Sequence, residues 1–171
     1  MAELTTKEKL QPSLLDRLTD DAPKQRQESR DRRVLSMRRL RQCVLRDLEW
    51  LMNSGNLAAT EDLDDYPLVA GSVLNYGMPE LAGCYASNMD LVGMERAVRQ
   101  AVLDFEPRIL RKTVKVRAVV SEDEMNVNAL TFEIEGELWA QPVPEKLFLK
   151  TEIDLETGAV TIAEEAGKRS D

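Results

Sequence analysis

The spacing of the apolar residues changes once along the chain, near residue 113. Before this point, two stretches carry apolar residues at steps of three and four, which is the repeat of an amphipathic helix. After it, apolar and polar residues alternate, which is the repeat of a strand with one buried face. A run of helices followed by a run of strands predicts an α+β fold.

Residues 36–53 carry the stronger helical pattern, and a second helix is expected to begin near residue 90 and to run to residue 105. Arg46 and Asp47 lie off the apolar stripe of the first helix, where they are available for pairing at the surface. The two stripes consist of Met37, Leu40, Val44, Leu48 and Leu51 in the first helix, and of Leu91, Met94, Val98, Ala101, Val102 and Phe105 in the second.

Four strand-like stretches follow, at residues 113–120, 130–138, 147–155 and 160–162. The outward faces of the first two carry opposite charges, so cross-strand ion pairs are expected between them. The predicted fold is therefore an antiparallel four-stranded meander, with the two main amphipathic helices and some short helical turns packed on one face. Between the two helices we expect a loop at residues 56–67 and then a short helical turn capped at Ser72. The last strand is expected to be an open sheet edge, which is a ready place for a neighbour to add a strand.

A length of 171 residues and an apolar content of 43% predict one domain with a real core. We place this domain at residues 34–163, after a tail at 1–33 that holds a short docking helix and a linker, and before a polar tail at 164–171. We predict neither a membrane-spanning helix nor a signal peptide. Cys43 and Cys84 lack metal-type spacing, so a reducing cytoplasm is the expected compartment.

The short helix of the N-terminal tail is predicted from its capping residues. Ser13 can cap it, and Asp16 lies at the third helical position, as in a capping box. Leu14, Leu15 and Leu18 then form one apolar edge. A helix this short is not stable alone, so we expect it to dock either on the domain itself or on a partner.

The charge of the chain is unevenly spread. The formal net charge is −8, yet residues 24–46 hold nine Lys or Arg and only two Asp or Glu. This stretch lacks aromatic residues and nucleic-acid motifs, so a solvated face or a surface for an acidic protein is favoured over nucleic-acid binding. The chain has no histidine, and the acids at 61–65 lack the glycine and distal glutamate of a calcium loop. We therefore predict no catalytic residue, no metal site and no cofactor.

Glu106, Pro107 and Arg108 follow directly after the second predicted helix. The proline ends that helix because it forces the preceding residue out of the α region. The stiff turn is expected to present one carboxylate and one guanidinium outward at a corner of the fold. Such a pair suits planar recognition of charged groups on another chain. The competing interpretation is a helix stop with two solvated charges.

Six short segments carry a resemblance to a known family. They are PSLLDRL (12–18), VLRDLE (44–49), SVLNYG (72–77), FEPR (105–108), LWAQP (138–142) and TEID with TG (151–154 and 157–158). In this order and spacing they resemble the TssE baseplate subunits of bacterial type VI secretion systems, a family similar to the wedge proteins of contractile phage tails.

The resemblance implies a small wedge component that links the inner baseplate to the base of the contractile sheath. It implies that the Glu-Pro-Arg triplet binds neighbouring wedge subunits and that the sheet edge continues the strand exchange of the sheath. The implied partners are TssF, TssG and TssK, the spike hub, and the sheath proteins TssB and TssC, in a cytoplasmic complex docked at the inner membrane. The candidate partner-binding residues are Glu106, Pro107, Arg108, Leu14, Leu15 and Arg17.

Two other functions compete with this reading. Related phage proteins have carried a lysozyme label, but glycoside hydrolysis needs two carboxyl groups about 5–10 Å apart, one of them protonated. The guanidinium of Arg108 disfavours a protonated acid at Glu106, so we predict that the chain is not an enzyme. A regulatory adaptor on the same scaffold is the second alternative, because a fold does not fix a function. The proteins that co-purify with the chain would separate these functions.

Overall fold

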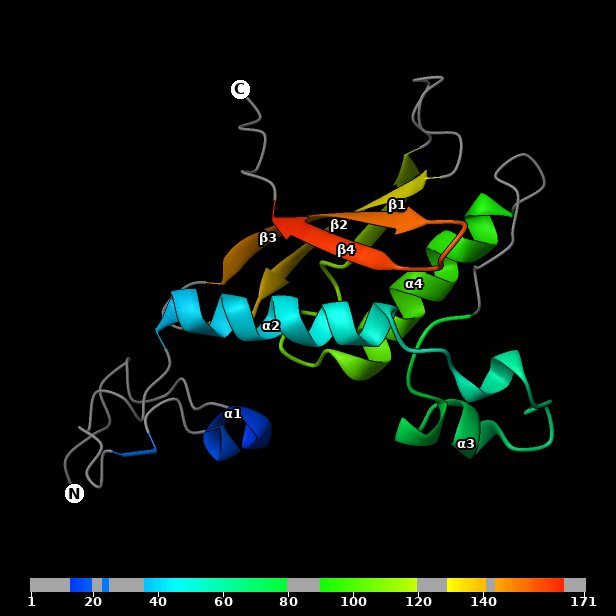
Figure 1. Ribbon diagram of the computed structural model, residues 1–171, viewed down its shortest axis with the longest axis horizontal. Helices are drawn as coiled ribbons and strands as arrows, with labels where there is room; N and C mark the ends of the chain where they lie inside the picture. Colours follow the sequence, from blue (N-terminus) through cyan, green and yellow to red (C-terminus); the bar gives the residue numbers. More distant parts are fainter. Residues whose placement is uncertain are drawn as a thin grey trace.

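Two long helices and a four-stranded antiparallel sheet form the body of the molecule (Figure 1). The α+β fold predicted from the sequence is confirmed. The computed structural model describes residues 13–19, 23–24, 36–79, 90–119, 129–140 and 144–164. Its elements are α1 (Leu14–Leu18), α2 (Met37–Met52), η3 (Leu57–Ala59), α3 (Pro67–Ala70), η4 (Val73–Asn75), α4 (Leu91–Phe105), β1 (Lys115–Val119), β2 (Ala129–Leu138), β3 (Glu145–Asp154) and β4 (Val160–Glu164).

The sheet is a meander in the order β1-β2-β3-β4, so β1 and β4 are its edges. In its register Lys115 faces Glu135 and Arg117 faces Glu133, which confirms the predicted pairing of opposite charges. Lys115 Nζ lies 3.7 Å from Glu135 Oε2. Every second side chain of β2 is buried, because the pleat sends successive side chains to opposite faces. One face of the sheet is therefore apolar.

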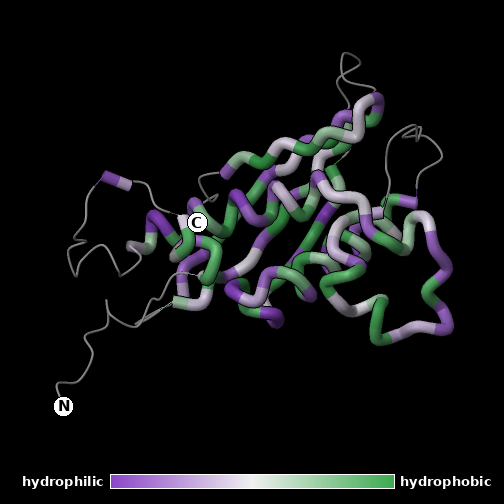
Figure 2. The backbone as a smooth tube through the Cα atoms, turned by 60° about the horizontal axis from the view of Figure 1, so that its bottom comes forward, coloured by the Kyte–Doolittle hydropathy of each residue, from purple (hydrophilic) through white to green (hydrophobic). Residues whose placement is uncertain are grey.

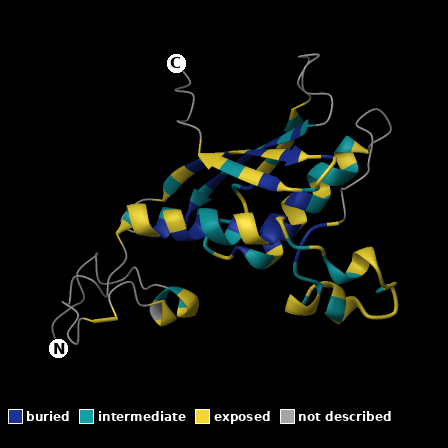
Figure 3. Cartoon of the chain, in the orientation of Figure 1, coloured by how far each residue is buried: buried dark blue, intermediate teal, exposed yellow. Residues whose placement is uncertain are grey.

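Helices α2 and α4 cover this apolar face, and the buried residues gather between the two layers (Figure 3). The core is one continuous cluster, to which each helix contributes its predicted stripe. Its largest fully buried apolar side chains are Val44, Leu48, Leu51, Val98 and Val102 from the helices, and Leu130, Phe132, Ile134, Leu138, Leu147 and Leu149 from the strands.

Polar side chains fix the ends of both long helices. Ser36 caps α2 and Asp90 caps α4, each through a side-chain oxygen that accepts a backbone N–H of the first turn. At the other end of α2, Asn53 Nδ2 donates to Val160 O at 2.8 Å, and Asn53 Oδ1 accepts from Val160 N at 2.9 Å. This amide pairs with β4 as a neighbouring strand would, and it ties the end of α2 to the sheet.

Between α2 and α4 the chain forms a lobe of three helical turns, η3, α3 and η4, which projects from the body (Figure 1). The turn predicted to begin at Ser72 is confirmed as η4, because Ser72 caps it. The loop predicted at residues 56–67 is wrong in part. Asn56 caps η3, and Pro67 occupies the first position of α3, where its missing N–H is not needed.

The lobe is joined to the body by a short parallel bridge between Gly55 and Met78. Met78 N donates to Ser54 O at 2.7 Å, and Asn56 N donates to Met78 O at 2.9 Å. Gly77 precedes this bridge with a φ of 126°, a backbone conformation that other residues rarely adopt. A Cβ at this position would lie 2.4 Å from Ser54 O, so the close approach of the two segments requires glycine.

Some sequence predictions concern residues outside the described part of the chain, and the domain limits at residues 34 and 163 stay predictions. The segments concerned are the polar stretch 1–10, the basic residues Arg30, Arg32 and Arg33, the environment of Cys84, the acidic turn 121–128 and the end of the C-terminal tail at 165–171.

Candidate functional site

The Glu-Pro-Arg triplet forms an elbow between α4 and the sheet. Helix α4 ends at Phe105, as predicted, and the N–H of its C-cap Glu106 still donates to Val102 O at 3.0 Å. After Pro107, the chain runs antiparallel to the end of β2, where Trp139 N donates to Arg108 O at 2.7 Å. Both sides of the elbow are thus fixed by backbone hydrogen bonds, and its side chains have defined positions.

Glu106 is buried, with only 3% of its surface exposed, so the predicted outward display of this carboxylate is wrong. The reason is that Arg108 folds back over it. Glu106 Oε1 accepts from Arg108 N at 3.1 Å and from Arg108 Nε at 2.7 Å, while Glu106 Oε2 accepts from Arg108 Nη2. These charge-assisted bonds satisfy both carboxylate oxygens, which makes burial of the charge tolerable.

Arg108 also reaches across to α2. Its Nη2 lies 2.6 Å from Asp47 Oδ2, and Asp47 Oδ1 accepts from Arg46 Nε at 2.8 Å. Arg46 Nη2 in turn lies 2.8 Å from Asp16 Oδ1 in α1. Acids and bases therefore alternate along one row, Glu106, Arg108, Asp47, Arg46 and Asp16, which we call the charge ladder. It joins three helices that are distant in sequence. The sequence singled out Glu106, Arg108 and Asp16, but it gave Arg46 and Asp47 only an unspecified role in surface pairing.

The ladder stabilises the charged forms of Arg108, Arg46 and Asp16. Burial lowers the pKa of Arg108, but the hydrogen bonds and charges of Glu106 and Asp47 outweigh it and raise that pKa above its usual value. The pKa of Arg46 is raised in the same way by Asp47 and Asp16. For Asp16, burial alone would raise the pKa, yet hydrogen bonds from Ser13, Cys43 and Arg46 lower it to about 2.

Helix α1 docks on the domain through Asp16. This side chain is only 3% exposed, and its Oδ2 accepts from the capping residue, Ser13 Oγ, at 2.6 Å. Docking in cis was one of the two predicted outcomes, but the predicted apolar edge does not mediate it, since Leu14 is 71% and Leu18 is 74% exposed. Leu15 is exposed as well, and the side chain of Arg17 lies outside the described part of the structure. The ion pair with Arg46, and not leucine burial, holds the helix.

Aromatic side chains border the ladder. Tyr76 packs edge-on against Phe105, with ring centroids 5.2 Å apart, and its hydroxyl donates to Asp47 O at 3.5 Å. Burial, and then the nearby charges of Asp47 and Glu106, raise the pKa of Tyr76. On the outer side, the Arg46 guanidinium lies 5.0 Å from the centre of the Trp50 ring, within the range of a cation–π contact.

The ladder is covered on its inner side and open on its outer side. The side chains of Arg108 and Asp47 are each 23% exposed, that of Arg46 is 28% exposed, and Pro107 is exposed. Arg108 Nη1 is buried and has no hydrogen-bond partner among the described residues. The elbow therefore offers a rigid outer surface of one proline and three paired charges.

A family model described as baseplate wedge protein gp25 matches residues 38–143, which is more than half of the chain. The matched region contains the elbow, both arginines and Asp47 of the ladder, and all of α4, β1 and β2. The chain belongs to this baseplate wedge family. The predicted resemblance is confirmed at this level. No curated protein and no solved structure matches the chain.

Membership of the baseplate wedge family supports a structural role in a baseplate, where a wedge protein contacts other baseplate components. The geometry agrees, because the ladder pairs its charges with one another and leaves no acid set apart as a proton donor. Among the described residues, no group of three or more His, Cys, Asp or Glu is placed to hold a metal ion. No helix in the described part is long and apolar enough to cross a membrane.

Proposed function

We propose that the chain is a TssE-type wedge subunit of a type VI secretion baseplate, which links the inner baseplate subunits to the base of the contractile sheath. The observation that carries this proposal is the family match over the elbow, α4 and nearly all of α2. The six family-like segments extend the likeness beyond that match, into α1 and into β3 and its turn. The role is structural, and no reaction is part of it.

The elbow is the proposed contact with neighbouring wedge subunits, TssF and TssG. Pro107 and the exposed parts of Arg108 and Asp47 meet the partner. Glu106 acts from beneath as a positioning residue, because its two oxygens fix the guanidinium plane. Glu106 therefore contributes to assembly indirectly. The sequence had instead predicted that an exposed Glu106 carboxylate would contact the partner directly.

Sheet edge β4 is the proposed place for strand exchange with the sheath proteins TssB and TssC. The opposite edge, β1, is already capped by α4, because Ala118 N donates to Glu95 Oε1 at 2.8 Å and Arg99 Nε donates to Val114 O at 3.2 Å. These contacts occupy backbone groups that an added strand would need. Edge β1 is therefore the weaker candidate.

On β4, among the described residues, only the first residue has its outward backbone groups bonded to a side chain of the same chain. Val160 pairs with the amide of Asn53, as described above. In an antiparallel ladder the outward-facing groups recur at every second residue, so the next ones belong to Ile162. No partner for them is found among the described residues. A strand from a neighbour would add to β4 from Ile162 onward.

The exposed leucines of α1 are a second proposed contact within the wedge. Leu14 and Leu15 face away from the domain while Asp16 holds the helix in place, so an ordered apolar edge is offered to a partner. Arg17 adjoins this edge in the sequence. Attachment of the assembled wedge to the inner membrane then runs through other subunits, with TssK as the proposed connection.

Co-purification with TssF and TssG tests the proposal. Arg108→Lys keeps a positive charge beside Glu106 but removes the planar fork, so we expect the chain to fold and the wedge complex to be lost. Lys115→Ala is the matched control, because Lys115 belongs to an exposed ion pair away from the elbow. If Arg108→Lys retains TssF and TssG as well as the control does, the elbow is not the contact. Recovery of a single regulatory protein in place of baseplate subunits would instead favour the adaptor.

A further inference from the structure

The lobe between α2 and α4 exposes large apolar side chains on an ordered backbone. Leu68 is 89%, Val73 is 80% and Leu74 is 68% exposed, and Tyr66 at the start of α3 is 61% exposed. The four lie within nine positions of the sequence, on turns α3 and η4, which contact each other. Figure 3 shows that most of the lobe surface is exposed. Such a concentration of apolar surface is typical of an interaction site.

The exposure is not that of a loose loop, because side-chain hydrogen bonds fix the backbone of the lobe. Asn75 alone makes two of them, since its Nδ2 donates to Ala70 O and its Oδ1 accepts from Ala58 N, each at 2.9 Å. Asn56 Oδ1 accepts from Ala59 N at 3.0 Å. These bonds connect all three turns. The apolar side chains are therefore presented in fixed positions, which lowers the entropy lost on binding.

The same lobe is strongly acidic. Glu61, Asp62, Asp64 and Asp65 are all exposed and directly precede the apolar residues, and the two kinds of segment adjoin in Figure 2. Moreover, residues 47–95 contain no Lys or Arg at all, although the whole chain has 23. The lobe thus has no basic side chain of its own to neutralise these acids.

The basic residues of α2 do not serve this purpose either. Arg38, Arg39 and Arg41 lie in its first half, about 15–20 Å from the end that leads to the lobe, by the rise of an α-helix. Arg46 lies closer to that end, but it is already paired with Asp47 and Asp16. Arg41 is moreover bound to Glu164 at 2.7 Å and to Glu145 at 3.4 Å. The acidic charge of the lobe is therefore left for a partner.

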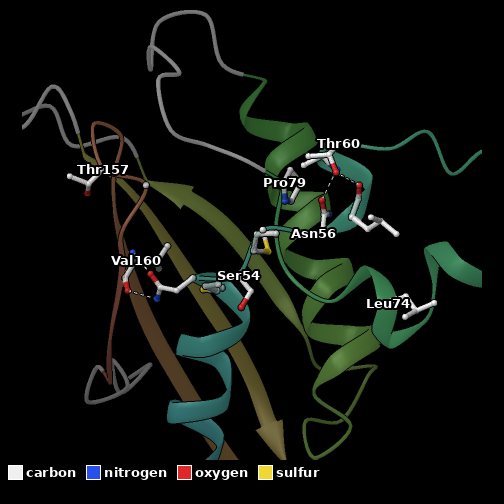
Figure 4. Close-up of a pocket in the computed structure, with 14 residues that line it drawn as sticks. Ser54, Asn56, Thr60, Leu74, Pro79, Thr157 and Val160 are labelled. Carbon is white, nitrogen blue, oxygen red and sulfur yellow. Dashed lines mark hydrogen bonds between the residues drawn. The ribbon is translucent and has the colours of Figure 1, made fainter.

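A groove extends this surface toward the sheet. It has a volume of about 610 Å³ and runs between the lobe and the β3–β4 turn. Figure 4 shows Asn56, Thr60 and Leu74 on the lobe side and Thr157 and Val160 on the hairpin side. Leu74 belongs to both the groove and the apolar patch, so the two form one continuous surface. Among the described residues, no basic side chain lines the groove.

We propose that this lobe and groove bind an amphipathic helix of a partner protein whose polar flanks are rich in Lys and Arg. The apolar stripe of such a helix covers Leu68, Val73 and Leu74, and its flanks pair with the acids at 61–65. Like charge repels phosphate-bearing partners, so nucleic acid and anionic membranes do not fit this surface. The interface is separate from the elbow, and in the described part of the chain it touches β4 only at Val160, whose backbone is already paired with Asn53. The inference therefore goes beyond the proposed function.

Photo-crosslinking in the assembled complex tests the proposal. A photo-reactive amino acid replaces Leu68 in the full chain, in the cells that make it, and a matched version replaces Val92, an apolar residue of α4 that is 54% exposed. Both positions are exposed, so neither change should affect folding, which thermal unfolding of the purified chains checks. We expect position 68 to give about ten times more crosslinked product than position 92, as for an interface against a free surface.

Mass spectrometry of the crosslinked peptide then decides between occupants. The proposal requires a segment of another protein with a helical apolar repeat and a net positive charge. Asp64→Asn with Asp65→Asn should lower the yield about two- to fivefold, as expected for two exposed ion pairs. Equal yields at positions 68 and 92, a crosslink to an acidic or uncharged segment, or a crosslink to a second copy of this chain would each overturn it.

Discussion

Replacing Glu106 by alanine should destabilise the isolated chain, because Glu106 is buried. The same change at an exposed corner residue would have little effect. Glu106 accepts three hydrogen bonds from Arg108, and its removal leaves that guanidinium bound only to Asp47. Breaking a fully buried ion pair costs about 3–5 kcal/mol. Because Arg108 is 23% exposed and keeps Asp47, we expect a loss of about 2–3 kcal/mol in the free energy of unfolding.

Thermal unfolding followed by circular dichroism measures this loss. For a chain of this length, about 2–3 kcal/mol corresponds to a Tm lowered by roughly 5–10 °C. The matched control is Lys115→Ala, which breaks an ion pair whose members are 67% and 42% exposed. We expect this control to change the free energy of unfolding by at most about 0.5 kcal/mol.

A double variant shows whether the loss comes from an uncompensated charge. Glu106→Gln together with Arg108→Met removes both charges and leaves Asp47 paired with Arg46. It should be more stable than the sum of the two single changes predicts, by about 1–2 kcal/mol. A Glu106→Ala variant with the Tm of the control, or a double variant that is simply additive, would refute the reasoning.

Three further predictions concern α1 and the joints around the lobe. The pKa of Asp16 is lowered to about 2, so its ionised form supports α1 docking above pH 3.8, its ordinary pKa, and this support is lost as the pH falls toward 2. The protection factors of the α1 amides, which correct for the intrinsic effect of pH on exchange, should therefore fall in that window, whereas in Asp16→Asn they should be low already at pH 7. Asn53→Ala removes both hydrogen bonds to Val160 and should lower the free energy of unfolding by about 1–2 kcal/mol, measured by urea denaturation. Gly77→Ala would place a Cβ at a positive φ and too close to Ser54 O, so it should lower the Tm by at least about 5 °C.

The architecture could be predicted because its signals are local. The repeat of three and four in α2 and α4 and the alternation along β2 each fix a buried face, and the three faces can only be covered by one another. The opposite charges on the outward faces of β1 and β2 were readable in the same way, and the structure places Lys115 opposite Glu135. Caps at Ser13 and Ser72 were readable for the same reason, since the capping residue and the N–H that it accepts are neighbours in the chain.

The interior of the site could not be predicted, because it depends on contacts between distant residues. Arg108 meets Asp47 across 61 positions, and Arg46 meets Asp16 across 30. Sequence reasoning treated Glu106 as exposed because a charged residue after a helix usually is, and nothing local reveals a guanidinium that folds back over it. The adjacent opposite charges of Arg46 and Asp47, off the apolar stripe, were the one available signal.

The exposed leucines of α1 bear on a choice that the sequence left open, between docking on the domain and docking on a partner. An apolar edge on a short helix normally docks on its own domain, yet here one buried carboxylate anchors the helix and leaves the leucines outside. That arrangement is consistent with an edge kept for a partner. On α1 and again on the lobe, the sequence alone could not show whether the apolar residues belong to the core or lie exposed on an ordered surface.

Amide hydrogen exchange of the chain, alone and bound to TssF and TssG, tests the central claim most directly. The account predicts slower exchange on binding at residues 106–110 and around Asp47, where the elbow and the charge ladder meet the partner. Unchanged exchange at these residues, in a complex that forms and protects other parts of the chain, would contradict it.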